Sequence, residues 1–412
     1  MLFAYNIFIY FYLIGIRLAA PFNSKARKWV AGRRDWQRNL AEKLGDNKDK
    51  IIWIHSASLG EFEQGRTLIE AIRSKHTHFK ILVTFFSPSG YEIRKNYHGA
   101  DYVIYLPIDT KKNATTFIEM TKPSLVIFIK YELWYHYLKT LQERNIPTIL
   151  ISAIILPSQS YFGVFAKFFQ SMLQLFTHVF VQDDQSKNLL ATIHIAENVS
   201  VAGDTRFDRV AETMRESFTN EALEHFCNNN QVLIAGSSWK EDEEALAFVQ
   251  SKIPHLKIII APHEINASHL DSIKSIFKDA VLLSEYSFDQ PAKVLIIDSI
   301  GMLSKIYRYA TIAYVGGGFN LSGIHNVLEA AAYGKVVCWG PNYNRSAEAS
   351  KMLELGCGFS YNNKEQLVHF IQNLLDDASQ REVKNKLAKD FVESNLGATN
   401  RIMVFLQDSN ML

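Results

Sequence analysis

Ile51-Ile-Trp-Ile-His-Ser-Ala-Ser-Leu-Gly-Glu-Phe-Glu-Gln-Gly-Arg66 passes from an apolar run through small residues into a helical pattern. Residues 51–54 are β-branched or aromatic and predict a buried strand, and residues 56–60 allow a tight turn. Apolar residues recur at helical spacing from Phe62 onward, which predicts a helix with Glu61 in its first turn. Because α/β sheets bind ligands where a strand leads into a helix N-terminus, we expect chemistry at Glu61.

A purely structural explanation fits the same place. Ser58-Leu59-Gly60-Glu61 has the spacing of a capping box, in which Ser58 caps the helix and the Glu61 carboxylate accepts a hydrogen bond from the backbone N–H of Ser58. Such caps are common, so the spacing alone leaves a structural and a catalytic Glu61 both open. The rest of the chain has to decide between them.

Short apolar runs alternate with helical or polar segments along the chain, which is typical of parallel sheets covered by helices on both faces. The predicted strands of the first series are 51–54, 80–86, 102–105, 125–129, 148–152 and 179–181, and those of the second are 232–235, 257–260, 294–297, 311–315 and 336–339. A chain of 412 residues exceeds the size of one core. The predicted organisation is an α/β chain with an anchor segment at 1–22, domains at 23–203 and 204–385 with a hinge near 202–208, and closing helices at 386–412.

The two halves begin alike, because residues 232–241 also run from a strand into a Ser-x-x-Glu pattern, Ser238 to Glu241. We interpret this second copy, which is followed by further acidic residues, as a plain capping box. Two similar α/β halves are expected to face each other across a cleft, to hold one substrate each and to exclude water by closing.

A glycine-rich segment follows the predicted strand 311–315, with the sequence Val315-Gly-Gly-Gly-Phe-Asn-Leu-Ser-Gly-Ile-His-Asn-Val-Leu-Glu-Ala-Ala331. Glycines let a backbone approach a phosphate, and a following helix N-terminus favours an anion. Asn326 and Glu329 lie three residues apart, where Glu329 could accept bonds from ribose hydroxyls or Asn326 could cap the helix. The segment matches neither the dinucleotide fingerprint nor a P-loop, which argues against oxidoreductases and ATPases.

The N-terminus is apolar and aromatic over Leu2–Ile16, and a basic stretch comes directly behind it. The basic residues are Lys25, Arg27, Lys28, Arg33, Arg34 and Arg38. The apolar run is short for a spanning helix, so we expect a helix lying on the membrane first, a spanning anchor second and a buried first helix third. Basic residues beside an anchor bind anionic head groups and keep the protein on the cytoplasmic side. Deletion of 1–22 is expected to weaken membrane association more than the fold.

Other compositional features exclude several classes of site. Cys227, Cys338 and Cys357 are scattered without metal-ligand spacing, which indicates reduced thiols, no disulfide framework and no zinc site. A net charge of +2 gives no reason to expect nucleic acid as a partner. The histidines, including His55 and His325, are expected to make local hydrogen bonds and not to bind metal.

Taken together, these segments resemble the 3-deoxy-D-manno-octulosonic acid (Kdo) transferases of lipopolysaccharide synthesis over nearly the whole chain. The resemblance is carried by the N-terminus, Ser56-Ala-Ser-Leu-Gly-Glu61, Glu132-Leu-Trp134, Gly203-Asp-Thr-Arg-Phe-Asp208, Val315-Gly-Gly-Gly318 and His325-Asn-Val-Leu-Glu-Ala-Ala331. It implies a GT-B glycosyltransferase with two Rossmann-like domains, a membrane-associated N-terminal domain for a lipid A precursor and a C-terminal domain for CMP-Kdo. The implied reaction is an inverting transfer of Kdo from CMP-Kdo to the 6'-hydroxyl of lipid IVA, without metal or cofactor, at the cytoplasmic face of the inner membrane.

The resemblance also implies roles for particular residues. Glu61 matches the general base, and Arg206 matches a basic residue that stabilises the transition state. The segments that match CMP contacts are Pro262 and His263, Ile300, Gly301 and Met302, and Asn326, Val327, Leu328 and Glu329. Lys130 stands where many relatives have a stabilising Glu, and we keep it as a catalytic candidate because a lysine can also stabilise an anion. His263 stands where an Arg is common, and residues 153–158 lack the Arg that many members carry there.

A single carboxylate is sufficient as the base of an inverting transfer, and the helix N-terminus favours an ionised Glu61 at neutral pH. Two other functions remain open. A sugar-nucleotide epimerase of similar architecture would need no lipid anchor, and a non-catalytic membrane adaptor would need neither Glu61 nor the glycine-rich segment. Product analysis with CMP-Kdo and a lipid acceptor separates the three.

Overall fold

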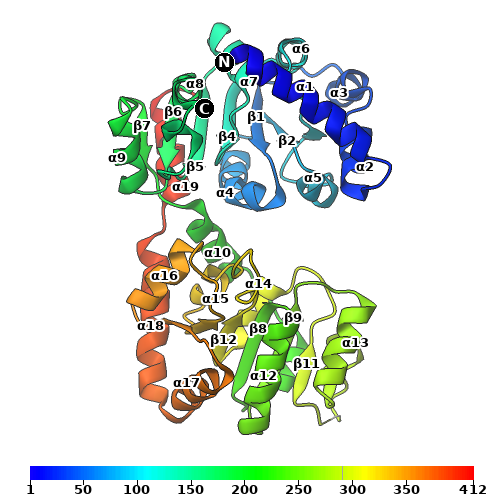
Figure 1. Ribbon diagram of the computed structural model, residues 1–412, viewed down its shortest axis with the longest axis vertical. Helices are drawn as coiled ribbons and strands as arrows, with labels where there is room; N and C mark the ends of the chain where they lie inside the picture. The colour runs from blue at the N-terminus through cyan, green and yellow to red at the C-terminus, as the bar shows by residue number, and fades with distance from the viewer. Residues whose placement is uncertain (290) are drawn as a thin grey trace. The chain divides into compact units, whose positions relative to one another are not determined.

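The computed structural model describes residues 1–289 and 291–412, which form two compact units (Figure 1). The first unit is Met1–Arg209 together with Leu396–Leu412, and the second is Val210–Asn395. Each unit contains a seven-stranded sheet whose paired strands are all parallel. The predicted class of two Rossmann-like α/β domains is thereby confirmed. The unit limits at 209/210 and 395/396 differ from the predicted 203/204 and 385/386, and the last helix returns to the first unit.

The sheet of the first unit has the strand order β3-β2-β1-β4-β5-β6-β7. Its strands are β1 Ile51–Ser56, β2 Lys80–Phe85, β3 Tyr102–Tyr105, β4 Pro123–Ile129, β5 Thr148–Ala153, β6 His178–Val181 and β7 Val199–Val201. Every residue of β1 is buried, because Ile52 and Ile54 join a core on one face of the sheet and Trp53 joins a core on the other. Both faces are therefore covered, which explains the continuous apolar run.

The helices of the first unit flank this sheet. They are α1 Leu2–Ala19, α2 Ser24–Ala31, α3 Trp36–Leu44, α4 Leu59–Lys75, α5 Pro88–Arg94, α6 Lys111–Thr121, α7 Tyr135–Glu143, α8 Ala166–Leu173, α9 Asp184–Thr192 and α19 Ala398–Asp408, and α10 Thr205–Arg215 runs across the unit limit. α19 packs beside α4 and adds Ile402, Met403 and Leu406 to the core. The Asp208 carboxylate accepts the N–H groups of Gly397 and Thr399 at 2.7 Å each, which fixes the start of α19.

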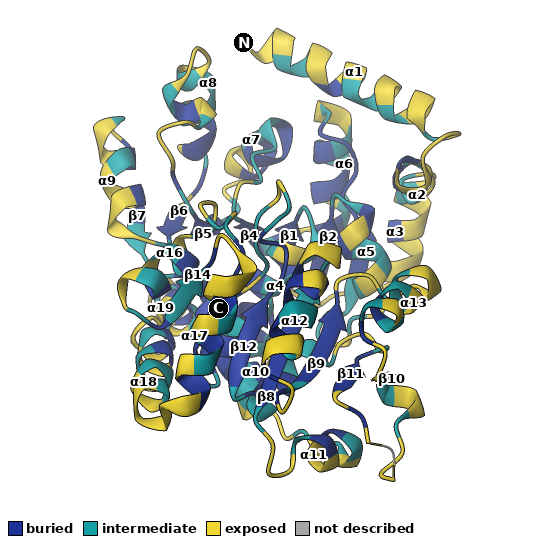
Figure 2. Cartoon of the chain, turned by 60° about the horizontal axis from the view of Figure 1, so that its bottom comes forward, coloured by how far each residue is buried: buried dark blue, intermediate teal, exposed yellow. Residues whose placement is uncertain are grey.

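The sheet of the second unit has the order β10-β11-β9-β8-β12-β13-β14. Its strands are β8 Val232–Ser238, β9 Lys257–Pro262, β10 Ala280–Leu282, β11 Val294–Ile296, β12 Ile312–Val315, β13 Val337–Trp339 and β14 Gly358–Ser360. Its helices are α11 Glu221–Cys227, α12 Lys240–Lys252, α13 Ala267–Ile276, α14 Leu303–Ile306, α15 Leu328–Ala331, α16 Ala347–Glu354, α17 Lys364–Asp376 and α18 Ala378–Ser394. Figure 2 shows the strands of this sheet largely in the colour of buried residues.

Every predicted strand is present, and three strands were not predicted, β7, β10 and β14. Each of the three is only three residues long and lies at the outer edge of its sheet. An edge strand is covered less completely than a central one, so its side chains need not be uniformly apolar. Gly358–Ser360, for example, has no buried residue and no β-branched side chain.

Helix α1 lies against the first unit by one side only, and Figure 2 shows it mostly in the colour of exposed residues. By length and composition α1 could cross a membrane, and only 6% of its residues are buried. Its inner side packs through Ile9 on Trp29 and Ile108, and its Tyr5 hydroxyl donates to the buried carboxylate of Asp109. The expectation of a buried first helix is therefore wrong.

The outer side of α1 carries large exposed side chains that include Phe3, Phe11 and Leu18, which are 79%, 69% and 70% exposed. The inner contacts show that α1 is also part of the fold, because its removal would leave Asp109 without the Tyr5 donor and uncover Trp29. Deletion of residues 1–22 is therefore expected to disturb the fold as well, and a larger effect on membrane association stays a prediction.

Candidate functional site

Glu61 lies in the first turn of α4, just beyond the end of the central strand β1. Its Oε2 accepts the backbone N–H of Ala57 at 2.6 Å. Ser58 is the N-cap residue, but among the described residues its hydroxyl makes no capping hydrogen bond. The predicted reciprocal pair of Ser58 and Glu61 is therefore not formed: the Ser58 hydroxyl does not cap the helix, and the carboxylate accepts the N–H of the residue before the N-cap.

The protonation of Glu61 differs from the prediction. Burial raises its pKa to about 7, and the nearby Glu132 carboxylate acts in the same direction, while the N–H groups of Ala57 and Ser58 and the Lys130 ammonium lower it. Desolvation thus outweighs the helix N-terminus that predicted a fully ionised side chain. A carboxyl whose pKa lies close to the operating pH is suited to accept a proton in a reaction.

The first unit brings the three predicted catalytic residues together around Tyr131. Lys130 follows β4 with a left-handed backbone (φ 71°), and its ammonium lies 5.3 Å from the centre of the Tyr131 ring. Burial raises the pKa of Tyr131, Arg206 lowers it and Glu61 raises it, so both charged groups lie within electrostatic range of the Tyr131 hydroxyl. Arg206 also forms an ion pair with Asp204, with Nη2 at 2.6 Å from Oδ2.

A polar network that the sequence did not reveal supports this edge. His55 is fully buried in β1, and its Nδ1 lies 2.8 Å from the Thr84 hydroxyl on β2. Its Nε2 lies 3.1 Å from Oε2 of Glu132, which also accepts the indole N–H of Trp134 at 2.7 Å. His55 thus makes local hydrogen bonds, as predicted. The Glu132-Leu-Trp134 motif was visible in the sequence, but the pairing of Glu132 with His55 depends on strand register.

The predicted CMP-contacting segments of the second unit lie at the carboxyl ends of neighbouring strands, in the order β11-β9-β8-β12. Pro262 ends β9, residues 300–302 lie between β11 and α14, and residues 326–329 lead into α15 after β12. Ile300 is 92% exposed, and Gly301 has the positive φ of 91° that favours glycine. All three segments therefore border one edge of this sheet, where α/β folds bind ligands.

Three aromatic rings stack at this edge. His263 stacks on Trp239, at a centroid separation of 4.6 Å, and on His325, at 4.5 Å. The Trp239 indole N–H donates to Nε2 of His325 at 3.4 Å, so these two rings also contact each other directly. Burial lowers the pKa of His325 to about 4, and His263 acts in the same direction, so His325 is neutral at pH 7. His263 itself is exposed and can contact a ligand.

The glycine-rich segment differs from the prediction of a phosphate-binding turn at a helix start. Most of its backbone is engaged within the protein: Gly316 N–H donates to Gly236 O, His325 N–H to Gly316 O and Ile324 N–H to Asn342 O. The helix begins only at Leu328 and has four residues. Asn326 accepts the Leu328 N–H at 3.1 Å and donates to Glu329 at 3.2 Å, so it acts as the cap.

The second capping box is also shifted. The N-cap of α12 is Trp239, and its N–H donates to Oδ2 of Asp242 at 3.0 Å. The predicted pair, Ser238 with Glu241, is one residue too early. Ser238 is instead the last residue of β8, which extends three residues beyond the predicted strand 232–235.

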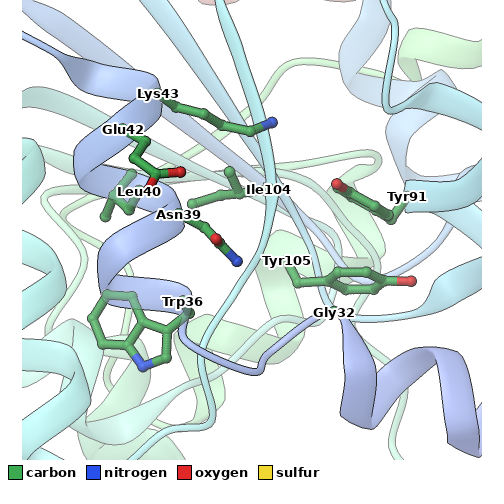
Figure 3. A pocket seen from close by; sticks show the side chains of 9 residues that line it. All are labelled: Gly32, Trp36, Asn39, Leu40, Glu42, Lys43, Tyr91, Ile104 and Tyr105. Carbon is green, nitrogen blue, oxygen red and sulfur yellow. The ribbon is translucent and has the colours of Figure 1, made fainter.

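A pocket of about 400 Å³ lies in the first unit between α3 and the edge strand β3, and none of the predicted site residues lines it (Figure 3). Its polar side chains already have partners: Lys43 donates to Val103 O at 2.8 Å, Asn39 to Arg34 O at 3.2 Å, and Glu42 pairs with Arg38 at 2.8 Å. We therefore assign this pocket no part in the site. Among the described residues, no group of three or more His, Cys, Asp or Glu side chains could hold a metal ion, and the three cysteines are free.

Known proteins resemble this chain in sequence. Residues 34–209 match the family model described as 3-deoxy-D-manno-octulosonic-acid transferase (kdotransferase). A 3-deoxy-D-manno-octulosonic acid transferase of Rickettsia bellii is 28% identical, over 94% of this chain and 93% of the relative. A bifunctional glycosyltransferase/methyltransferase of Fusobacterium nucleatum is 27% identical over 94% of this chain, which spans only 61% of that protein.

Solved structures share the fold. UDP-GlcNAc 2-epimerase from Neisseria meningitidis, bound to UDP-GlcNAc, superposes with a TM-score of 0.63 at 16% identity, covering 87% of this chain and all of that one. At this identity the likeness concerns the fold alone. The family model matches residues 34–209, and the transferase relatives match the sequence across most of the chain. In sequence this chain is therefore similar to the 3-deoxy-D-manno-octulosonic acid transferases.

Proposed function

We propose that this protein is an inverting glycosyltransferase that moves Kdo from CMP-Kdo to the 6'-hydroxyl of a lipid A precursor, lipid IVA, and releases CMP. The observation that carries the proposal is the grouping of Glu61 with Lys130, Tyr131 and Arg206 at one edge of the first sheet. A carboxyl with a pKa of about 7 that interacts with the Lys130 ammonium, with Arg206 acting on the neighbouring Tyr131, provides a base and partners for anionic substrates.

In the proposed step the Glu61 carboxylate accepts the proton of the 6'-hydroxyl as that oxygen attacks the anomeric carbon of Kdo. The bond between this carbon and the phosphate oxygen breaks, and CMP leaves from the opposite face with the bonding electron pair. The Kdo carboxylate, the CMP phosphate and the phosphates of the acceptor are all anions. Lys130 and Arg206 would stabilise them, and the reaction needs no metal or cofactor.

For the donor we propose binding at the edge of the second sheet. Pro262 and His263, residues 300–302 and residues 326–329 would contact CMP-Kdo there. The support is their common location at the carboxyl ends of adjacent strands. His263 is exposed beside the rings of Trp239 and His325, where its ring nitrogens could bind phosphate or carboxylate oxygens.

We also propose that α1 lies on the cytoplasmic face of the inner membrane and brings the first unit to its lipid acceptor. A helix with one docked side and one exposed apolar side fits a surface-bound helix better than a spanning one. Basic residues behind it, such as Lys25 and Lys28, would bind anionic head groups. Arg33 does not belong to this group, because its guanidinium donates to the carbonyl oxygens of Leu106 and Phe86.

The pH dependence of transfer follows from Glu61. A base acts only when ionised, so kcat/KM is expected to fall as the pH decreases through about 7. Glu132→Gln removes a carboxylate that raises the pKa of Glu61, so the acidic limb should move to lower pH. Initial rates between pH 5 and 9 measure both profiles. If kcat/KM of Glu132→Gln falls at the same acidic pH as that of the wild type, the electrostatic coupling of Glu61 and Glu132 is contradicted.

The proposed activity is tested by incubating the purified protein with CMP-Kdo and tetraacylated lipid IVA and weighing the lipid products by mass spectrometry. We expect an acceptor whose mass has increased by Kdo and the release of CMP. A parallel incubation with UDP-GlcNAc tests the epimerase alternative. Conversion of UDP-GlcNAc to its epimer, or an unmodified acceptor with CMP-Kdo present, would overturn the proposal.

A further inference from the structure

Asp242 is a fully buried carboxylate at the carboxyl edge of the second sheet, and both of its oxygens are hydrogen bonded. Oδ2 accepts the backbone N–H of Trp239 at 3.0 Å and that of Gly317 at 2.9 Å. Oδ1 accepts the Tyr314 hydroxyl at 2.6 Å, and that hydroxyl lies 2.9 Å from the hydroxyl of Tyr361. One side chain therefore joins the segment that follows β8 to the segment that follows β12.

These two segments are in close contact. β8 and β12 are neighbours in the sheet, with Gly236 opposite Val315. A Cβ atom at Gly316 would lie 2.4 Å from Ser237 O and 2.8 Å from Oδ2 of Asp242, so no side chain fits there. The backbone of the glycine-rich segment therefore lies directly against the Asp242 carboxylate. The absence of a side chain at Gly316 is what allows this close contact.

The same two segments carry two of the three rings, Trp239 and His325. Trp239, whose N–H is held by Asp242, stacks on His263 after β9, which stacks on His325. His325 lies within the glycine-rich segment, and its N–H donates to Gly316 O at 3.1 Å. Its ring also covers Gly317, where a Cβ atom would lie 3.0 Å from Cδ2 of His325. A shift of either segment would therefore displace the rings and the cap residue Asn326 that follows His325.

We propose that Asp242 is a positioning residue for the nucleotide donor: it holds Trp239 and Gly317 in register and so sets the ring stack and residues 326–329 against the CMP moiety. The inference rests on the proposed donor site. Asp242 does not itself touch the donor, because its oxygens are occupied by protein donors. The neighbouring Glu243 makes a different tie, because its carboxylate contacts the Ser238 hydroxyl and the His269 ring and, among the contacts of the described residues, does not touch the glycine-rich segment.

The test uses Asp242→Asn. Asparagine has one acceptor oxygen where aspartate has two, and its NH2 group would face the Tyr314 hydroxyl or the N–H groups of Trp239 and Gly317. The lost hydrogen bonds are expected to let the segment after β8 separate from the segment after β12. Glu243→Gln is the matched control, because it makes the same chemical change one residue along α12 at an equally buried position that does not touch the glycine-rich segment. Binding of CMP and of CMP-Kdo is measured by calorimetry, together with KM, kcat and the melting temperature.

We expect Asp242→Asn to raise the Kd for CMP and the KM for CMP-Kdo about tenfold or more, as the loss of one or two hydrogen bonds to a charged group predicts, with a smaller change in kcat. Glu243→Gln should lower the melting temperature by a similar amount and leave KM near the wild-type value. Equal donor binding in Asp242→Asn and wild type overturns the inference alone, and equal losses in both variants reduce it to a structural role. Failure of the wild type to bind CMP overturns both the inference and the proposed donor site.

Discussion

Replacement of Glu61 by Gln is expected to reduce transfer from CMP-Kdo about 100-fold to 10,000-fold, the usual contribution of a positioned base. Glutamine retains the shape and the hydrogen bond to the Ala57 N–H, but it cannot accept the proton of the acceptor hydroxyl. The substitution lies in the first unit, and the donor segments lie in the second, so donor binding should stay unchanged. Single-turnover rates and calorimetric binding of CMP-Kdo measure the two effects separately.

Glu70→Gln provides the control for this experiment. Glu70 lies on the same helix, where its carboxylate pairs with Arg66 at 2.7 Å, and it makes no contact with the group around Tyr131 among the contacts of the described residues. Its turnover should stay within a few-fold of the wild type, since a partly exposed ion pair contributes about 1 kcal/mol or less. Substantial turnover by Glu61→Gln would assign Glu61 to capping and leave the base unidentified.

Replacement of Phe3, Phe11 and Leu18 together by Ser is expected to weaken membrane binding at least about 100-fold, because burial of each such side chain contributes roughly 1.5–3 kcal/mol. All three are exposed on the outer side of α1, so the fold loses no packing. Flotation with vesicles that contain anionic lipid measures the bound fraction. These substitutions replace the deletion of 1–22 as the test of the anchor, since the deletion would also remove Ile9 and Tyr5 from the first unit.

The matched control replaces three exposed apolar residues elsewhere, Ile93, Phe288 and Val383, which are 60%, 52% and 59% exposed. This second triple variant should float like the wild type. If both triple variants lost vesicle binding equally, the loss would reflect the number of exposed apolar residues and not their location on α1. Flotation of the α1 variant at the wild-type level would show that membrane binding does not depend on this face.

The fold could be predicted from the sequence because central parallel strands are covered on both faces. Their apolar runs, such as 51–54 and 125–129, stand out without any structural information. The edge strands β7, β10 and β14 escaped prediction because three residues at a sheet edge need no apolar pattern. The return of α19 to the first unit could not be predicted either, since an amphipathic helix does not indicate which sheet it will cover.

For the site, local sequence located Glu61 and the segments at the strand ends, because a strand leading into small residues has few interpretations. Its electrostatics could not be predicted. The helix N-terminus is a local feature. The burial that dominates the pKa of Glu61, and the approach of Glu132 from the segment after β4, arise only in the folded chain. The same holds for Asp242, whose partners Trp239 and Gly317 are brought together by the pairing of β8 with β12.

The position of α19 has a consequence for how the chain acquires its structure during synthesis. The core of the first unit includes Ile402, Met403 and Leu406 of α19. The Asp208 carboxylate can accept the N–H groups of Gly397 and Thr399 only after these residues have been synthesised. The second unit is contiguous, Val210–Asn395, and has all of its residues before α19 is translated. The first unit is therefore completed only after the second unit has been synthesised, and its helix α4 lacks its neighbour α19 until that helix leaves the ribosome.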